Sequence, residues 1–180
     1  MSLRSFINLA ITALETTPTR DLLEISSVIV DRANHGGKVI IVGNGGSAAI
    51  ASHLAIDFTK SAGVRAISFN DSSLITCFAN DYGYSDWVEK AIDFYADPDD
   101  ILILISSSGR SSNIINAAKR GMKRGLYVVT LSGFDSDNSL RFIGSKNLWL
   151  DSHNYNVVES THCAWLLGIV EEIRTHKGKS

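Results

Sequence analysis

The sequence has few cysteines, no long apolar run and no cluster of basic residues. Cys77 and Cys163 are the two cysteines among 180 residues. Both stand in apolar periodic segments without C-x-x-C spacing, which predicts reduced thiols in the core. No stretch approaches the length that crosses a bilayer, and the N-terminus, MSLRSFINLAITALETT, lacks the continuous apolar run of a signal peptide. We therefore expect a cytoplasmic protein with no membrane partner.

The charge is also low, with a formal net value of −2 and basic residues scattered along the chain. This pattern lacks the positive footprint of a nucleic-acid binder, so nucleic acid is not expected as a direct partner. Backbone N–H groups and hydroxyls can still hold a small phosphate. A chain of 180 residues is long enough for one domain whose core folds without disulfides, and we expect a single domain over residues 1–180.

The most informative stretch is KVIIVGNGGSAAIASHLAIDF, residues 38–58. A short β-branched run at 39–42 predicts a buried parallel strand. The glycine-rich turn at 43–47 allows N–H groups to converge on an anion where the next helix begins. A tight turn that needs glycine for geometry alone is the alternative. The spacing fits neither G-x-x-x-x-G-K-[ST] nor G-x-G-x-x-G, so no nucleotide cofactor is predicted.

A second loop of the same kind follows the most hydrophobic run of the chain. Residues 101–105, ILILI, predict a strand buried on both faces, and they lead directly into SSSGRSSN at 106–113. This hydroxyl-rich loop precedes another helical segment. The sequence therefore predicts two anion-binding loops, each at the end of a strand.

Strands and helices alternate through most of the chain. The expected strands lie at 39–42, 64–69, 101–105, 126–131 and 147–150, which predicts an α/β fold: a doubly wound, flavodoxin-like, five-stranded parallel sheet. Ligands bind such sheets beyond the carboxyl ends of the strands. Two amphipathic helices within 1–35 precede the α/β core of 36–180 as a helical hairpin. The sheet covers their apolar faces only in part, which favours a homo-oligomer.

The two loops, GNGGS at 43–47 and SSSGRSSN at 106–113, resemble those of the sugar isomerase (SIS) domain family. The order GNGGSAAIASHLAIDFTK, CFANDYGY, DILILISSSGRSSNIINAAKRG and HNYNVVESTH is similar to the phosphoheptose isomerase group along most of the chain. The resemblance implies an aldose–ketose isomerase that works through an enediol on a small phosphorylated sugar. Sedoheptulose 7-phosphate, a precursor for surface-polysaccharide heptoses, is the implied substrate. The implied assembly is a tetramer with active sites at subunit boundaries, and a dimer is the alternative.

The resemblance also assigns binding roles. Arg110 stands where the family often has a small polar residue, and it either adds charge to the phosphate site or points into solvent. Asp71 matches an acidic residue of the sugar pocket and fits equally well as the N-cap of the next helix. The residues implied for phosphate are Ser106, Ser107, Ser108 and Ser111, and those implied for the sugar are Asn44, Gly45, Gly46 and Ser47.

Aldose–ketose isomerisation needs a base for the carbon-bound proton and a second group or metal that polarises the carbonyl. His53 and Asp57, four residues apart on one helix face, match the histidine and glutamate that serve the family as metal ligand and as ligand or base. Aspartate in place of glutamate shortens the reach by one methylene.

The last helix departs further from the family, which carries a Q-E-x-H pattern and a distal histidine there. Our alignment puts Val158 at the glutamine and Leu166 at the distal histidine, so His162 is the one ionisable group left on that face. His162 either replaces the missing acid–base group or ligand, oriented by Glu159, or is a buried histidine with a satisfied hydrogen bond.

With His53, Asp57 and His162 convergent, a three-ligand site is predicted, with His153 or Glu159 as a spare ligand and zinc as the metal. Asp57 and His162 are then the predicted catalytic residues. The lost glutamine and histidine suggest an alternative, a non-catalytic sugar-phosphate sensor or a scaffold like the DnaA initiator-associating relatives. Retention of His53, Asp57 and the serine loop favours the enzyme, since a scaffold has no physical need for a carboxylate beside a phosphate cradle.

Overall fold

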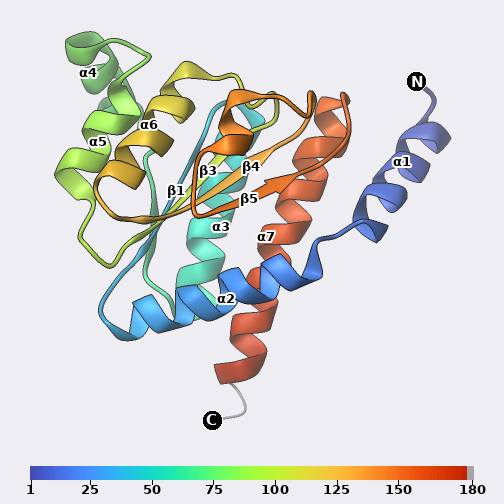
Figure 1. The fold of residues 1–180 in the computed structure, drawn as a ribbon, viewed down its shortest axis with the longest axis horizontal. Helices are drawn as coiled ribbons and strands as arrows, with labels where there is room; N and C mark the ends of the chain where they lie inside the picture. Colours follow the sequence, from blue (N-terminus) through green and yellow to red (C-terminus); the bar gives the residue numbers. More distant parts are fainter. Residues whose placement is uncertain (178–180) are drawn as a thin grey trace.

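The computed structural model describes residues 1–177 and contains a five-stranded, fully parallel sheet in the order β2-β1-β3-β4-β5 (Figure 1). This is the doubly wound arrangement that the sequence predicts. The strands are β1 (Val39–Gly43), β2 (Ala66–Ser68), β3 (Ile101–Ser106), β4 (Tyr127–Ser132) and β5 (Lys146–Trp149). The helices are α1 (Leu3–Glu15), α2 (Thr19–Asn34), α3 (Gly46–Lys60), α4 (Ser72–Tyr82), α5 (Trp87–Tyr95), α6 (Ser112–Lys123) and α7 (Tyr155–Lys177), with the 3₁₀ turn η1 (Ser139–Phe142) before β5.

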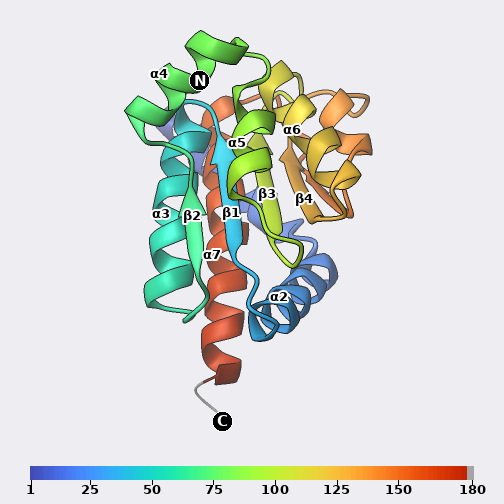
Figure 2. The ribbon, with the colours of Figure 1, turned by 90° about the vertical axis from the view of Figure 1, so that its left-hand side faces the viewer.

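Strand β3 lies at the centre and is buried along its whole length. Its side chains alternate between two hydrophobic clusters, as the period of a strand requires. Ile101, Ile103 and Ile105 face the cluster built with α2, α3 and α7, whereas Leu102 and Leu104 face the one built with α5 and α6. Figure 2 shows helices on both faces of the sheet. The apolar run at the start of β3 is thus explained by burial on two sides.

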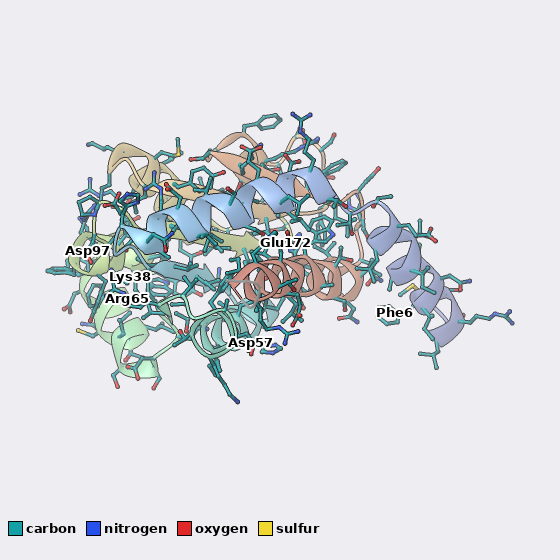
Figure 3. The ribbon with its side chains drawn as sticks, turned by 90° about the horizontal axis from the view of Figure 1, so that it is seen from below. Phe6, Lys38, Asp57, Arg65, Asp97 and Glu172 are labelled. Atoms are coloured by element: carbon teal, nitrogen blue, oxygen red, sulfur yellow. The ribbon has the colours of Figure 1, made fainter. Side chains whose placement is uncertain are left out.

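A buried ion pair joins the starts of β1 and β3. The Asp100 side chain is fully buried and accepts hydrogen bonds from the backbone N–H of Lys38 at 2.8 Å and from its Nζ at 2.5 Å. Asp97 also contacts Lys38 Nζ, at 2.8 Å, and both residues are labelled in Figure 3. Because these bonds satisfy the buried Asp100 carboxylate from the residue that precedes β1, they fix the two central strands relative to one another.

The two N-terminal helices differ from the predicted hairpin, because both α1 and α2 pack against α7. In Figure 1, α1 projects to one side of the molecule. Ala13 is the buried residue of α1, while Leu3 is 75% and Ile11 is 51% exposed. Most apolar side chains of α1 therefore remain exposed, which leaves an apolar helix surface open.

The cysteines are both free thiols, but the prediction of two core positions is wrong for Cys77. Cys77 is exposed on α4, a helix without buried residues, and Cys163 on α7 is half-buried. The apolar spacing of α4 predicts a core position, but the helix packs only partly, against α5. Among residues 1–177, no helix is both long and apolar enough to cross a membrane.

Candidate functional site

The strand order reverses between β1 and β3, and both predicted loops begin at the carboxyl ends of these two strands. This switch point is where open α/β sheets bind ligands. The loops line a common cavity of about 270 Å³. Its lining residues are Asn44, Gly45, Gly46, Ser47, Ile105, Ser106, Ser107, Ser108, Ser111, Tyr155 and Glu159. The structure therefore brings together all eight predicted loop residues.

The glycine loop is held by a pair of amides. Asn44 Nδ2 donates to Asn113 Oδ1 at 3.0 Å, and Asn113 Nδ2 donates back to Asn44 Oδ1 at 2.9 Å. The Tyr84 hydroxyl donates to the same Asn44 oxygen at 3.1 Å. Gly45 has a φ of 55°, a conformation that glycine adopts without strain. These contacts tie the two loops together across the switch point.

The serine loop is rich in donors and has an unpaired hydroxyl. Ser106 Oγ and Ser111 Oγ lie 3.2 Å apart, and Ser111 is the N-cap of α6. The Ser107 hydroxyl is buried and has no hydrogen-bond partner within the chain described here. A buried hydroxyl without a partner costs free energy unless a ligand supplies one. The loop thus presents polar groups that a phosphate can pair.

Charge at this loop comes from dipoles, not from a basic side chain. Arg110 Nη2 donates to Asp135 Oδ2 at 2.6 Å, and the arginine side chain is largely exposed, so it pairs with a neighbouring loop and does not line the cavity. The orphan N–H groups at the start of α6 carry the positive end of the helix dipole. An anion can bind there without a lysine or arginine.

The loop after β4 supports the serine loop from behind. Gly133 N–H donates to the Ser107 carbonyl at 2.9 Å, and Leu140 N–H donates to the Gly109 carbonyl at 3.1 Å. Gly109 has a φ of 62°, and the Asn138 side chain occupies the space where a Cβ would stand. The serine loop therefore has little freedom to change shape.

Two residues of α7 complete the cavity: Tyr155, which the sequence analysis did not assign to the site, and Glu159, which it assigned only as a partner of His162 or a spare ligand. Tyr155 lines its wall and packs edge-on against Phe134, with ring centroids 4.7 Å apart. Glu159 directs its carboxylate at Gly46, where it occupies the space that a Cβ would need. Glu159 faces the cavity, whereas Val158, which the sequence analysis places at the family's glutamine, packs on Gly133 in the core.

His53 and Asp57 form a pair on α3. His53 Nε2 lies 3.0 Å from Asp57 Oδ2, as the four-residue spacing predicts. Asp57 follows Gly46 by eleven residues, which is roughly 16 Å along the helix axis. Figure 3 labels Asp57 on α3, and neither residue lines the loop cavity of this chain. The predicted catalytic Asp57 thus stands apart from the predicted phosphate loop.

The prediction that His162 acts at the site is wrong, and the buried-histidine alternative holds. His162 is fully buried, and its Nε2 lies 3.1 Å from the Ser132 carbonyl, to which it donates. Burial lowers the pKa of His162 to about 4, and the hydrogen bond to Ser132 opposes that shift only in part. The imidazole is therefore neutral and faces the sheet.

The predicted three-ligand metal site does not form within the described chain. Residues 1–177 contain no group of three or more His, Cys, Asp or Glu side chains placed to hold a metal ion. His53 and Asp57 are adjacent, but His162 is in the core. Two donors fall short of the three or four protein ligands that zinc takes. These residues do not fit the metal that the resemblance implies, and we route no chemical step through it.

Asp71 is an N-cap. Its Oδ1 accepts a hydrogen bond from Leu74 N–H at 3.0 Å, and it is outside the residues that line the cavity. The capping interpretation is confirmed, and the assignment of Asp71 to the sugar pocket finds no support within one chain. The polar residues after β2 thus begin a helix, and the sugar-binding role of Asp71 stays a prediction.

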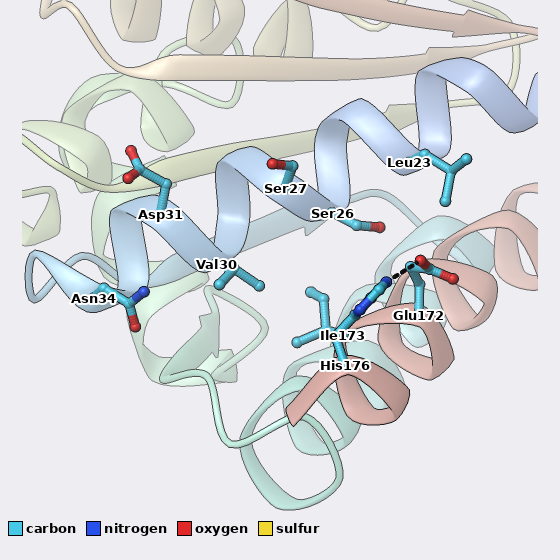
Figure 4. Close-up of a pocket in the computed structure, with 9 residues that line it drawn as sticks. All are labelled: Leu23, Ser26, Ser27, Val30, Asp31, Asn34, Glu172, Ile173 and His176. Atoms are coloured by element: carbon cyan, nitrogen blue, oxygen red, sulfur yellow. Dashed lines mark hydrogen bonds and ion pairs between the residues drawn. The ribbon is translucent and has the colours of Figure 1, made fainter. Parts of the chain in front are cut away.

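A second hollow, of about 400 Å³, lies between α2 and the end of α7 (Figure 4). It is mainly apolar, with Leu23, Val30 and Ile173 in its walls and His176 Nε2 at 2.7 Å from Glu172 Oε1 at its edge. It sits at the end of the molecule opposite the two loops. Its lining has no glycine-rich or serine-rich loop of the kind that forms the loop cavity.

Comparison with known proteins agrees with this geometry. The SIS domain family matches residues 4–133. The phosphoheptose isomerase of Cytophaga hutchinsonii is 36% identical over 66% of this chain and 65% of its own length. That of a Bradyrhizobium species is 33% identical over 94% of this chain and 88% of its own. The alignments with three of the curated relatives span between 57% and 65% of those proteins.

A solved structure extends the match to nearly the whole fold. The phosphoheptose isomerase of Francisella tularensis superposes with a TM-score of 0.86 at 26% identity, and the match covers 96% of this chain and 94% of that one. The matched length includes both loops and the last helix. On these grounds the chain belongs to the SIS domain family, in its phosphoheptose isomerase group.

Proposed function

We propose that this protein is a phosphosugar aldose–ketose isomerase that acts on sedoheptulose 7-phosphate in the cytoplasm. The observation that carries the proposal is the cavity at the switch point, where a donor-rich loop without basic side chains faces a carboxylate across about 270 Å³. The phosphoheptose isomerases among its relatives support the same substrate. The free thiols of Cys77 and Cys163 agree with a reducing compartment.

In this proposal the serine loop holds the phosphate. The hydroxyls of Ser106, Ser107 and Ser111 and the first N–H groups of α6 donate to its oxygens. Charge-assisted hydrogen bonds of this kind are about twice as strong as neutral ones. The sugar hydroxyls then face the glycine loop, where Asn44 is already oriented by Asn113.

The reaction moves one proton from C1 to C2 and one between the two oxygens, through an enediol. It needs no oxidant and no nucleotide. A carboxylate within reach of C1 is the minimum requirement. A non-catalytic sensor or scaffold would keep the phosphate cradle but have no use for the carboxylate, and the comparisons do not favour it.

The test is conversion of sedoheptulose 7-phosphate to the aldose, followed by NMR with and without added zinc, alongside phosphate-ester binding by calorimetry. We expect conversion by the wild type and its loss, together with weaker binding, in a Ser106→Ala/Ser111→Ala variant. Binding without conversion of five- to seven-carbon ketose phosphates would identify a sensor instead.

The exposed apolar surface of α1 supports a homo-oligomer, a tetramer or a dimer, as the working form. Leu3, Ile7, Leu9 and Ile11 are each at least 45% exposed, which is more apolar surface than one helix of a stable monomer usually leaves open. Light scattering should give a multiple of 19.6 kDa. A Leu9→Glu/Ile11→Glu variant should then dissociate, and a monomeric wild type would contradict this part of the proposal.

A further inference from the structure

The peptide that joins Ser132 to Gly133 stands directly behind the serine loop. Its N–H, from Gly133, donates to the Ser107 carbonyl at 2.9 Å, and its C=O, from Ser132, accepts a hydrogen bond from Leu150 N–H at 3.0 Å. The N–H and C=O of a trans peptide point in opposite directions. The orientation of this one peptide therefore helps to determine where Ser107 stands at the edge of the loop cavity.

Helix α7 holds the same peptide from a third side, through His162. The His162 Nε2–H donates to the Ser132 carbonyl at 3.1 Å, so this oxygen accepts two hydrogen bonds, one for each of its lone pairs. One turn earlier on the helix, Val158 packs against Gly133 and leaves no room there for a Cβ. Helix α7 thus fixes both residues of the peptide, one by a hydrogen bond and the other by packing.

The imidazole of His162 is costly to keep in this position. It is fully buried, and its Nδ1 has no hydrogen-bond partner within residues 1–177. A buried polar atom without a partner costs free energy, and an apolar side chain of similar size would avoid that cost. His162 is also outside the residues that line the loop cavity. What the histidine provides, and an apolar residue would not, is the hydrogen bond to the Ser132 carbonyl.

This series of contacts ends at Ser107, a residue whose orientation matters for binding an anion. The Ser107 hydroxyl is buried and has no partner in the described part of the chain, and the residue lines the cavity. A tight turn surrounds it, closed by Gly109 N–H, which donates to the Ser106 carbonyl at 2.9 Å. Because a hydrogen bond weakens as its angle departs from linear, a small rotation of Ser107 would misalign its donors with a phosphate.

We propose that His162 is a positioning residue for the phosphate site, an inference that rests on the proposed function. Its hydrogen bond fixes the peptide between Ser132 and Gly133, and the N–H of that peptide fixes Ser107. His162 touches no substrate atom and exchanges no proton with the substrate. All four residues belong to one chain, so their contacts do not depend on the groups that a second subunit adds at the cavity.

The experiment compares His162→Met, which removes the donor and keeps a similar volume, with His162→Gln, whose amide nitrogen reaches the position of Nε2. The matched control is Thr161→Val. Thr161 is also buried on α7, and its hydroxyl donates within the helix, to the Val157 carbonyl at 2.8 Å. The readouts are the dissociation constant of inorganic phosphate by calorimetry, the free energy of unfolding in urea, and KM and kcat for sedoheptulose 7-phosphate.

We expect His162→Met to bind phosphate roughly threefold to tenfold more weakly, the change that corresponds to one hydrogen bond, and to raise KM more than it lowers kcat. Its free energy of unfolding should change little, because the lost hydrogen bond is offset by the removal of an unpaired buried nitrogen. His162→Gln should restore the phosphate affinity to within about twofold of the wild type. Thr161→Val should bind phosphate as the wild type does.

A double variant tests whether His162 acts through Ser107. In a Ser107→Ala background, His162→Met should cause little further loss of phosphate affinity, because both changes affect the same contact with the ligand. A full additional loss in that background would overturn the inference, and so would a His162→Met protein that binds phosphate as tightly as the wild type. If His162→Met does not fold, His162→Asn, whose amide is too short to reach the Ser132 carbonyl, is measured with the same expectations.

The same measurements separate this inference from the proposed function. A wild type that binds phosphate, with the expected order of affinities among the variants, but converts no ketose phosphate would support the positioning role and overturn the isomerase. A wild type that binds no phosphate would overturn both.

Discussion

Replacing the buried His162 by glutamine is expected to change how the free energy of unfolding depends on pH. The histidine has a pKa of about 4 in the folded protein, against 6.5 for an unperturbed imidazole. The unfolded chain therefore binds a proton first as the pH falls, and folding stability is lost below about pH 6.5. Above that pH the group contributes no pH dependence.

The size of the change in the free energy of unfolding follows from the difference between the two pKa values of His162. Each unit between the two pKa values is worth about 1.36 kcal/mol, so the whole shift amounts to about 3 kcal/mol, of which about 2 kcal/mol has been lost at pH 5. Glutamine cannot take up a proton, and its amide can still donate to the Ser132 carbonyl. The stability difference between wild type and His162→Gln should therefore shift by about 2 kcal/mol in favour of the variant between pH 7.5 and pH 5.

Urea unfolding at fixed protein concentration measures this difference, since oligomerisation would otherwise mix into the result. At each pH, the free energy of unfolding of the variant is subtracted from that of the wild type, which cancels the contribution from titration of the other groups. A difference that stays constant from pH 7.5 to pH 5 would refute the reasoning. It would mean that the imidazole accepts a proton in the folded protein and is not confined to the core.

Asp100→Ala should lower the free energy of unfolding by about 3 kcal/mol, because it leaves the half-buried Lys38 ammonium without its main partner; chemical denaturation would show no loss if the pair were dispensable. Gly133→Ala places a Cβ 2.8 Å from both Val158 methyl carbons and should lower stability by about 1–3 kcal/mol, so an unchanged melting temperature would contradict it. Ser107→Ala removes a buried hydroxyl that lacks a partner; it should weaken sugar-phosphate binding roughly tenfold or more without loss of stability, and unaltered calorimetric affinity would count against the cradle.

The sheet and both loops could be predicted from sequence because their signals are local. The run ILILI before the serine loop has to be buried on both faces, and β3 is buried throughout. Glycine and serine at the strand ends indicate loops whose N–H groups are free for an anion. Each of these statements depends on a few neighbouring residues, and the structure places the two loops at one cavity.

The last helix could not be interpreted in the same way. Apolar residues surround α7, because it packs against α1, α2 and α3 as well as the sheet. With no single apolar face, the sequence does not say whether Val158 or Glu159 meets the cavity, because neighbouring residues point about 100° apart around the helix axis.

The predictions for Cys77 and Asp71 were also limited because a local pattern does not show what packs around a residue. The apolar residues of α4 predicted a core helix with Cys77 inside, yet α4 has no buried residue. Asp71 fitted both a cap and a sugar ligand, and its contact with Leu74 N–H shows the cap, which the pattern alone does not. In each case the pattern is local but the outcome depends on what packs nearby, which a periodicity does not contain.

The most direct test of the central claim is the fate of the C1 protons when wild-type protein is mixed with sedoheptulose 7-phosphate in deuterium oxide. The account predicts deuterium at C1 together with the appearance of the aldose in the same NMR time course. A substrate that binds, as calorimetry would show, but keeps its C1 protons unlabelled over many binding events would contradict it. The cavity would then be a phosphate-binding site without the isomerisation chemistry.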